Sequence, residues 1–367
     1  MAGTIILHHD KKVDISSQYV CMLTKKNEIR QKQTTGEKAM GKARNIALIA
    51  IAISSTTFAQ PVAANMNITL CGGSPGGLWS LLGAGIDNAV RRVEPGSTVT
   101  YQTSSGGFAN IVQLAQGKCD LAIVHIGEVL IAARGEEPFK EQTGGIAAVS
   151  LLYDWAPMQW VIDKGYATRN NLHSIADLAQ SGDKFNLVVN RRGILPSILA
   201  EKSMAEAGVT FDSIEAVGGG IQYQGSGTAS EIMQDGKADA WVNATFVGSG
   251  SINSIAAKRD VTLLSVPKTV IEHMQATYGS KPVTIPAGAY DWLDRDIQTF
   301  GAQAALITAE NADPEMVKLV ARAIFEHIEE IQTVHASMGA LDGKLAASIS
   351  LIDYHPAATE IISNAGY

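Results

Sequence analysis

One short element occurs twice in this chain, once in each half. It reads Gly117-Lys118-Cys119-Asp120-Leu121 in the first half and Gly236-Lys237-Ala238-Asp239-Ala240 in the second. In both places a helix-like run precedes the glycine, a common helix stop, and a strand-like run follows the aspartate. Two lobes of like topology account for the repetition simply, and chance is the alternative for so short a match. A chain of 367 residues is also longer than one hydrophobic core usually serves.

Strand-like and helix-like segments alternate around this element. The first half has strand-like runs at 67–71, 98–102 and 121–124, and apolar residues at helical spacing over 78–90 and 108–115. This β-α-β-α-β alternation is the opening of a doubly wound sheet, so the fold class expected is α/β. Beyond residue 157 the chain carries further strand-like and helix-like runs, at 158–162, 185–189, 196–207 and 238–242.

The N-terminal segment has the residue order of a secretory signal. Lys42 and Arg44 precede the apolar run 46–53, and small residues follow, ending in Val62-Ala63-Ala64. A core helix is the alternative, but nothing polar interrupts the run periodically. We therefore expect residues 40–64 to be a signal peptide and the mature protein to be periplasmic.

The first 39 residues are harder to place, because a signal peptide belongs at the start of a chain. Residues 1–39 are polar and mixed in charge. We predict that Met40 is the true initiator and that 1–39 is an extension from a misassigned start codon. No segment reaches the roughly 20 apolar residues that cross a bilayer, so we expect a protein that is not embedded in the membrane after cleavage.

The charge that remains after cleavage limits the possible partners. The chain carries 29 basic and 36 acidic residues, of which 9 and 4 lie in 1–64, so the mature protein has a formal net charge of −12. Such a surface argues against a nucleic-acid partner or an anionic membrane. The two mature cysteines, Cys71 and Cys119, lie in neither a metal-binding nor a C-x-x-C spacing. A bound anion must therefore be attracted by local groups.

Three loops at one edge of the predicted sheet carry candidate ligand-binding groups, since ligands of doubly wound sheets bind beyond the carboxyl ends of the strands. Gly72–Gly77 follows the first strand, and its backbone N–H groups and the helix N-terminus behind it suit a carboxylate or phosphate. A tight structural turn is the alternative. Ser104, Ser105 and Asn110 follow the second strand. The third strand ends at His125, which is alternatively a hydrogen-bonded structural histidine.

Catalytic motifs are missing from the sequence. The eight histidines include no H-E-x-x-H motif and no pair placed to share a metal. Neither G-x-S-x-G nor S-x-x-K stands in a convincing strand–turn–helix context. Asp120 and Asp239 begin strands, at the end opposite the ligand crevice, which disfavours acid–base roles. We therefore predict a binding protein that is not an enzyme and needs no metal and no cofactor.

A series of short segments, in the same order along the chain, resembles one family. They resemble the Gly-rich loop and the T-G-G-S-x-x-N, G-x-x-D (twice), I-P-A-G-x-Y and H-P-G-A elements of the TAXI-type solute receptors of tripartite ATP-independent periplasmic (TRAP) transporters. The resemblance runs from about Ile68 to the C-terminus. The matching segments are Gly72-Gly73-Ser74-Pro75-Gly76-Gly77, Ser104-Ser105-Gly106-Gly107-Phe108-Ala109-Asn110, the two repeated elements, Ile285-Pro286-Ala287-Gly288-Ala289-Tyr290 and His355-Pro356-Ala357-Ala358.

The resemblance implies a type II periplasmic-binding-protein fold, in which two doubly wound α/β lobes are joined by a hinge. It implies a first lobe of residues 66–157 plus 286–367 and a second lobe of 158–285, which close on a solute and dock on the TRAP membrane permease subunits. Solutes of the family are small carboxylates such as glutamate, glutamine or 2-oxoglutarate. A ligand sensor that docks on a receptor kinase and an enzyme on the same two-lobed fold are the alternatives.

Two departures from the family pattern bear on the expected anionic solute. Gly107 stands where the family usually has serine, so one hydroxyl group is missing. The segment 190–196 stands where the family has G-P-P-G-S-G-T, and it brings Arg191 and Arg192. A guanidinium group suits a carboxylate, so either arginine is a candidate ligand contact. A solvated or lobe-bridging charge is the alternative.

Aromatic side chains near these loops are expected to supply apolar walls to the site, with core or hinge packing as the alternative. Asn243 is expected to bound the crevice from the second lobe. The complete predicted ligand-binding set is Gly73, Ser74, Gly77, Trp79, Ser104, Ser105, Asn110, His125, Tyr153, Arg191, Arg192, Asn243 and Phe246.

Overall fold

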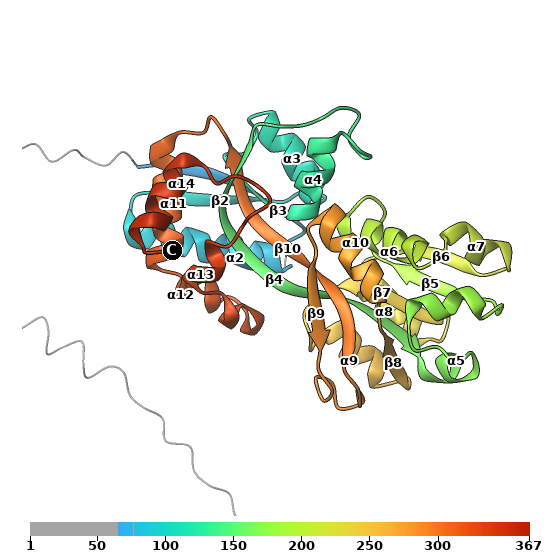
Figure 1. The fold of residues 1–367 in the computed structure, drawn as a ribbon. Coiled ribbons are helices and arrows are strands. Elements are labelled where there is room, and N and C mark those ends of the chain that lie inside the picture. The colour runs from blue at the N-terminus through green and yellow to red at the C-terminus, as the bar shows by residue number, and fades with distance from the viewer. Residues whose placement is uncertain (1–64, 76) are drawn as a thin grey trace, which may run out of the picture. The chain divides into compact units, whose positions relative to one another are not determined.

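A computed structural model of the chain describes residues 65–75 and 77–367 (Figure 1). The predicted extension 1–39 and the predicted signal peptide 40–64 lie outside the described residues. Within the described ranges, no helix is both long enough and apolar enough to span a bilayer.

The first sheet follows the expected β-α-β-α-β alternation. β1 (Asn67–Cys71) pairs in parallel with β2 (Thr98–Gln102) and with β3 (Leu121–His125). β10 (Ile297–Ala309) lies antiparallel between β3 and β4 (Ile146–Asp163). The strand order is therefore β2-β1-β3-β10-β4. The three parallel strands agree with the predicted runs to within one residue.

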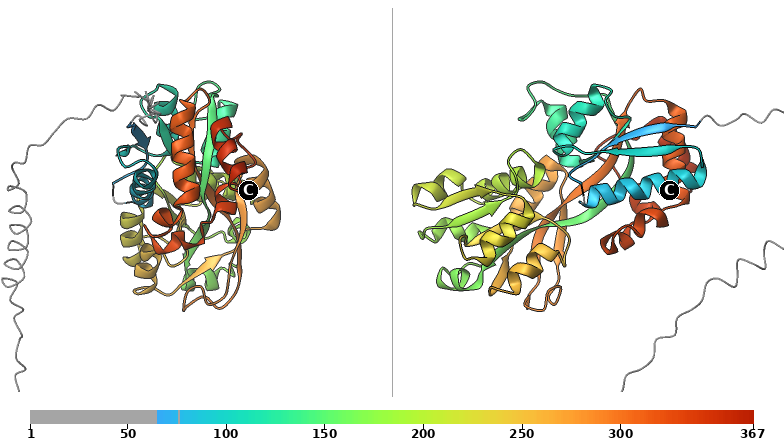
Figure 2. Two further views of the ribbon diagram at one scale, coloured as in Figure 1. Left: turned by 90° about the vertical axis from the view of Figure 1, so that its left-hand side faces the viewer. Right: turned by 180° about the vertical axis from the view of Figure 1, so that it is seen from behind.

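Helices from both ends of the chain pack around this sheet. α11 lies beside α2 and α14, as two further views show (Figure 2). Leu82 of α2 and Val320 of α11 are fully buried with Leu70 of β1 in one apolar cluster, which fixes these helices on the sheet. The helices of this part are α2 (Leu78–Val93), α3 (Gly107–Ala115), α4 (Ile126–Arg134), α11 (Pro314–Glu326), α12 (Glu329–Gln332), α13 (Gly343–Ala346) and α14 (Pro356–Asn364).

The second sheet repeats the strand order of the first. β5 (Asn186–Val189) pairs in parallel with β6 (Gly220–Tyr223) and β7 (Ala240–Ala244). Residues 158–163 of β4 lie antiparallel between β7 and β8 (Val261–Leu264), which gives the order β6-β5-β7-β4-β8. Two such sheets, each with one antiparallel strand at the same place, form the type II periplasmic-binding-protein fold. Its helices are α5 (Lys164–Arg169), α6 (Leu195–Glu206), α7 (Phe211–Ala216), α8 (Ser226–Gln234), α9 (Gly250–Ala256) and α10 (Lys268–Tyr278).

Two long strands belong to both parts of the fold (Figure 1). β4 pairs with β10 over residues 146–157 and with the second sheet beyond them. β10 pairs with β4 from Gly301 onward and with β9 (Lys281–Ile285) over residues 297–301. The sequence predicted only the end of β4, because residues 146–157 form a largely apolar run without alternation and end in Pro157, a residue that disfavours a strand assignment.

We propose that the two sheets are the centres of the two predicted lobes, 66–157 plus 286–367 and 158–285, and call them the first and the second lobe. The predicted boundaries place Tyr290 in the first lobe, yet it belongs with Trp241 to an apolar cluster of the second sheet. We therefore place the second crossing between the lobes within β10.

The repeated Gly-Lys-x-Asp element has the same structure in both lobes. The glycines that follow α3 and α8 adopt left-handed φ angles of 65° and 67°. Asp120 Oδ2 accepts a hydrogen bond from Thr69 N of β1 at 2.7 Å, and Asp239 Oδ2 accepts one from Asn186 N of β5 at 2.7 Å. In each lobe the aspartate thus joins the start of the third parallel strand to the first. The repetition in the sequence reflects a repeated structure.

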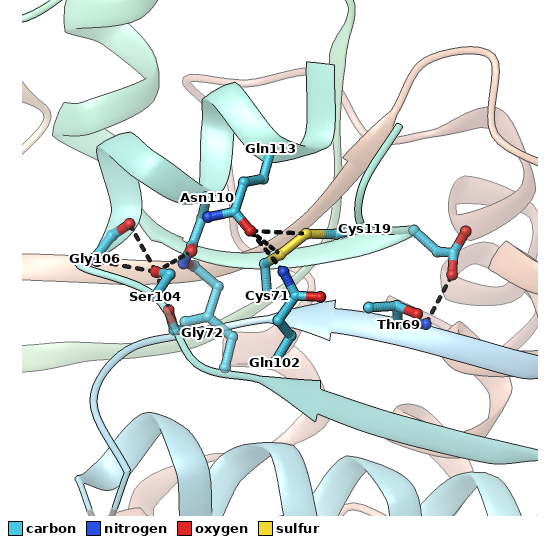
Figure 3. The surroundings of a disulfide bond; sticks show 11 residues. Thr69, Cys71, Gly72, Gln102, Ser104, Gly106, Asn110, Gln113 and Cys119 are labelled. Carbon is cyan, nitrogen blue, oxygen red and sulfur yellow. Dashed lines mark hydrogen bonds between the residues drawn. A yellow bond between two sulfur atoms is a disulfide. The ribbon is translucent and has the colours of Figure 1, made fainter. Parts of the chain in front are cut away.

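The first lobe also has a disulfide that the sequence analysis missed (Figure 3). Cys71, the last residue of β1, is bonded to Cys119, which directly precedes Asp120. The equivalent positions in the second lobe are Val188 and Ala238, which are buried in an apolar cluster. Two cysteines left in an exported chain are themselves a sign of a structural disulfide, whatever their spacing.

Candidate ligand-binding site

A cavity of about 300 Å³ opens at the carboxyl ends of β1, β3 and β5. Two larger cavities exist: one of about 680 Å³ lies around Asn67 and Asp120, at the amino end of β1, and one of about 700 Å³ lies around Arg192 and Tyr278. The smallest of the three is the candidate site, because ligands of doubly wound sheets bind at the carboxyl ends. Eight predicted residues line it: Gly73, Ser74, Gly77, Trp79, Ser105, His125, Tyr153 and Arg191.

The N-terminus of α2 faces this cavity, which Gly77, Leu78 and Trp79 line. Among the described residues, no side chain caps this helix end, and the first turn holds no acidic residue. The unpaired N–H groups of a first turn and the helix dipole favour an anionic group. The N–H group of Gly73 differs, because it donates to Tyr101 Oη at 2.6 Å and is engaged within the protein.

Three ring side chains form one wall of the cavity. Trp79 Nε1 donates a hydrogen bond to Tyr153 Oη at 3.0 Å, and the Trp79 ring centroid lies 5.1 Å from that of His125. Burial raises the pKa of Tyr153 far above its usual value, and the hydrogen bond from Trp79 offsets only part of this rise. Tyr153 is therefore a neutral hydroxyl at physiological pH. The wall combines residues of α2, β3 and β4.

Ser104 and Asn110 make hydrogen bonds within the loop, as Figure 3 shows, and they do not line the cavity. Ser104 Oγ lies within hydrogen-bond distance of Gly72 O and Asn110 Oδ1, and it accepts a hydrogen bond from Gly106 N at 3.0 Å. Asn110 is fully buried, and its Nδ2 donates to Ile123 O at 2.7 Å. These bonds tie the ends of β1 and β2 and the helix α3 to β3.

The second lobe contributes Arg191 to the cavity. Its Nη2 donates a hydrogen bond to Ser74 Oγ at 3.3 Å, so its side chain reaches across to the first lobe. The backbone N of Arg191 donates to Asn190 Oδ1 at 2.7 Å, and Asn190 Nδ2 donates to Asn243 Oδ1 at 2.8 Å. Asn243 is buried and donates in turn to Ser226 Oγ. Asn243 thus acts on the cavity through Asn190, a lining residue that the sequence analysis did not single out.

The remaining two predicted residues lie outside the cavity lining. Arg192 turns away from its neighbour, and its guanidinium carbon lies 3.8 Å from the centroid of the Tyr223 ring. Phe246 packs behind the ring wall, with its centroid 5.2 Å from that of Tyr153 and 6.2 Å from that of Trp155.

Glu128 lines the cavity and was missed by the sequence analysis. The residue is 1% exposed, and its Oε2 accepts a hydrogen bond from His125 N at 2.7 Å. A Cβ atom at Gly107 would overlap this Oε2. The serine expected at position 107 is therefore incompatible with Glu128 in this place. Three residues after a strand end, a glutamate is usually explained as a helix cap, so nothing in the sequence indicated that it also lines the cavity.

The described residues contain no group of three or more histidine, cysteine, aspartate or glutamate side chains that could hold a metal ion.

Comparison with known proteins gives a family match and several structural likenesses. The model of a family described as NMT1-like matches residues 70–366. MatC from Rhodopseudomonas palustris with bound malate is 14% identical, with a TM-score of 0.49 over 83% of this chain and 98% of that one. A TctC solute-binding protein from Polaromonas is 13% identical (TM-score 0.48, 83% and 96% covered). A TRAP periplasmic solute-binding protein from Sulfitobacter sp. with bound β-D-galacturonate is 12% identical (TM-score 0.41, 83% and 87% covered).

Proposed function

This chain belongs to the NMT1-like family, and from that membership, its fold and its cavity we propose that it is an extracytoplasmic solute-binding protein. It captures a small carboxylate-type solute between its lobes and delivers it to a membrane permease, catalysing no reaction. The observation that carries this proposal is Arg191, which reaches from the second lobe to Ser74 beside the uncapped N-terminus of α2.

The chemistry of this arrangement favours an anion. A guanidinium group forms charge-assisted hydrogen bonds with carboxylates. The N–H groups of Leu78 and Trp79 begin a helix of 16 residues, whose dipole adds partial positive charge at the same place. Since Arg191 comes from the other lobe, a carboxylate bound there contacts both lobes and favours the closed arrangement. The mature chain has a negative net charge, so these local groups supply the attraction.

The compartment and the partner complete the proposal. A disulfide between Cys71 and Cys119 suits an oxidising compartment such as the periplasm, in agreement with the predicted signal peptide 40–64. The short matches to TAXI-type receptors support TRAP membrane permease subunits as the docking partner. N-terminal sequencing of the secreted protein tests the export step: a product that begins near residue 65 is expected, and one that retains residues before Met40 contradicts the start-site prediction.

Thermal-shift screening of the secreted protein tests the function. The screen contains amino acids, dicarboxylates, 2-oxo acids and uncharged sugars. A bound acid present at about 100 times its Kd stabilises the protein by about 2.7 kcal/mol through mass action, and raises the melting temperature. We expect shifts from carboxylates and none from the sugars. The proposal fails if no carboxylate shifts the melting temperature, and its non-enzymatic part fails if the bound acid is converted to a product.

A further inference from the structure

The cavity contains a buried carboxylate as well as the groups that attract an anion. Glu128 is 1% exposed and lies at the first turn of α4, against the end of β3. Within residues 65–75 and 77–367, its one ion-pair partner is His125, whose Nδ1 lies 3.5 Å from Oε2 and is charged only when protonated. His125 Nδ1 is itself buried and makes no hydrogen bond with any described residue.

The position of Glu128 is built into the loops around it. Gly107, the first residue of α3, leaves the volume that the carboxylate occupies, since a Cβ atom there would overlap Oε2. The hydrogen bond from His125 N holds Oε2 in this volume. A carboxylate in so enclosed a place loses most of its hydration. The His125 N–H donor and the first turn of α4 offset part of this loss, and a cation or a further donor in the cavity would offset more of it.

The cavity therefore has two unlike poles. Arg191 and the N-terminus of α2 favour a negative group, whereas Glu128 favours a positive group or a strong donor, and all three line the same 300 Å³. We propose that the ligand is a zwitterionic amino carboxylate, with its carboxylate toward Arg191 and its protonated amine toward Glu128. Glu128 is then the residue that selects amino acids over the matching 2-oxo or 2-hydroxy acids. The inference rests on the proposed function and narrows its solute class.

Paired ligands that differ only at the amine test this inference. Isothermal titration calorimetry compares L-glutamate with 2-oxoglutarate and L-alanine with L-lactate, on the wild type and on the isosteric variant Glu128→Gln. In at least one pair we expect the wild type to bind the amino acid at least tenfold more tightly than its partner. In Glu128→Gln this ratio falls to about threefold or less, because the variant loses the charge that the amine requires.

A matched control removes a nearby negative charge outside the cavity. Glu136 is paired with Arg134 just beyond α4, and Glu136→Gln is expected to keep the wild-type ratio. Should Glu128→Gln fail to fold, the wild-type ratio decides alone. If an amine-free acid binds as tightly as its amino acid, the inference is overturned and the proposed function stands; this is the result expected if a protonated His125 already satisfies Glu128. If no acid of either kind binds, the proposed function and the inference fall together.

Discussion

The two lobes are alike at the amino ends of their parallel strands and different at the carboxyl ends. At the amino ends, Asp120 and Asp239 make the same hydrogen bond to the first strand of their lobe. At the carboxyl ends, the first lobe has a Gly-rich loop, an uncapped helix and Glu128, whereas the second lobe has the segment that carries Arg191. The shared ends build the sheets, and the proposed function divides the recognition of one ligand between the unlike ends.

The sheets of the two lobes differ in one further respect, which gives the largest expected effect. The disulfide Cys71–Cys119 of the first lobe corresponds to the apolar pair Val188 and Ala238 of the second. Replacing both cysteines by alanine is expected to lower the free energy of unfolding by about 2–4 kcal/mol, because the cross-link restricts the unfolded chain. Urea unfolding measures this. Dithiothreitol should lower the free energy of unfolding of the wild type to that of the variant, and it should leave the value of the variant unchanged. If dithiothreitol has no effect on the wild type, the disulfide does not distinguish the stability of the two lobes.

The second prediction concerns the room made for Glu128. Gly107→Ala is expected to destabilise the protein by about 1–3 kcal/mol, because the new methyl group overlaps the carboxylate. In the background of Glu128→Ala the same substitution should cost far less, since the obstructing group is gone. Urea unfolding of the four proteins of this double-mutant cycle gives the coupling. Additive effects would show that Gly107 and Glu128 are independent, and that the first lobe's carboxyl end is not organised around the carboxylate.

The hydrogen bond that Asp120 and Asp239 each make to the first strand of their lobe gives the third prediction. Asp120→Ala and Asp239→Ala are each expected to lower the free energy of unfolding by about 1–2 kcal/mol, because each leaves a backbone N–H of the first strand without its charged acceptor. Asp239 should be the more sensitive, since it also accepts a bond from Asn186 Nδ2. Asp235→Ala, at an exposed ion pair with Lys237, is the control and should leave the unfolding midpoint unchanged. A large loss of stability from only one of these two substitutions would show that Asp120 and Asp239 are not equivalent.

The smallest effect is expected at Arg192, which differs from Arg191 in what its guanidinium group contacts. Arg192→Ala removes the contact with Tyr223 and should lower the free energy of unfolding by about 0.5–1 kcal/mol, the usual size of an exposed cation–π interaction. The unfolding midpoint in urea measures it. In a protein that already carries Tyr223→Leu, the substitution Arg192→Ala should cause no further loss of unfolding free energy. If the losses of the two substitutions add, the Tyr223 ring is not the partner of Arg192.

Sequence patterns predicted the parts of the fold that depend on local periodicity. The three parallel strands of the first lobe, the strand at 185–189 and both repeated elements lie where periodicity and glycine stops placed them. The long strand β4 was missed over 146–157, because burial on both faces removes the alternation that identifies a strand. The disulfide was missed because spacing motifs do not describe a pair that is distant in sequence.

The side chains of the site were less predictable than its location. The edge of the sheet follows from the β-α-β order, and eight predicted residues line the cavity there. Which way a side chain turns depends on contacts across the fold. Ser104 and Asn110 are engaged in the loop, and only tertiary contacts separate Arg191 from Arg192. The sequence around Glu128 is typical of a helix cap. Its carboxylate occupies its place in the cavity lining only because Gly107 has no side chain.

Isothermal titration calorimetry of Arg191→Ala and Arg192→Ala tests the central claim most directly, with L-glutamate or the screened acid of largest thermal shift as the ligand. The two residues are adjacent and carry the same charge, so long-range electrostatics affect both variants alike. We expect Arg191→Ala to weaken binding at least tenfold, or about 1.4 kcal/mol, and Arg192→Ala to change it less than twofold. Wild-type affinity in Arg191→Ala would contradict the claim that the second lobe binds the carboxylate through this arginine.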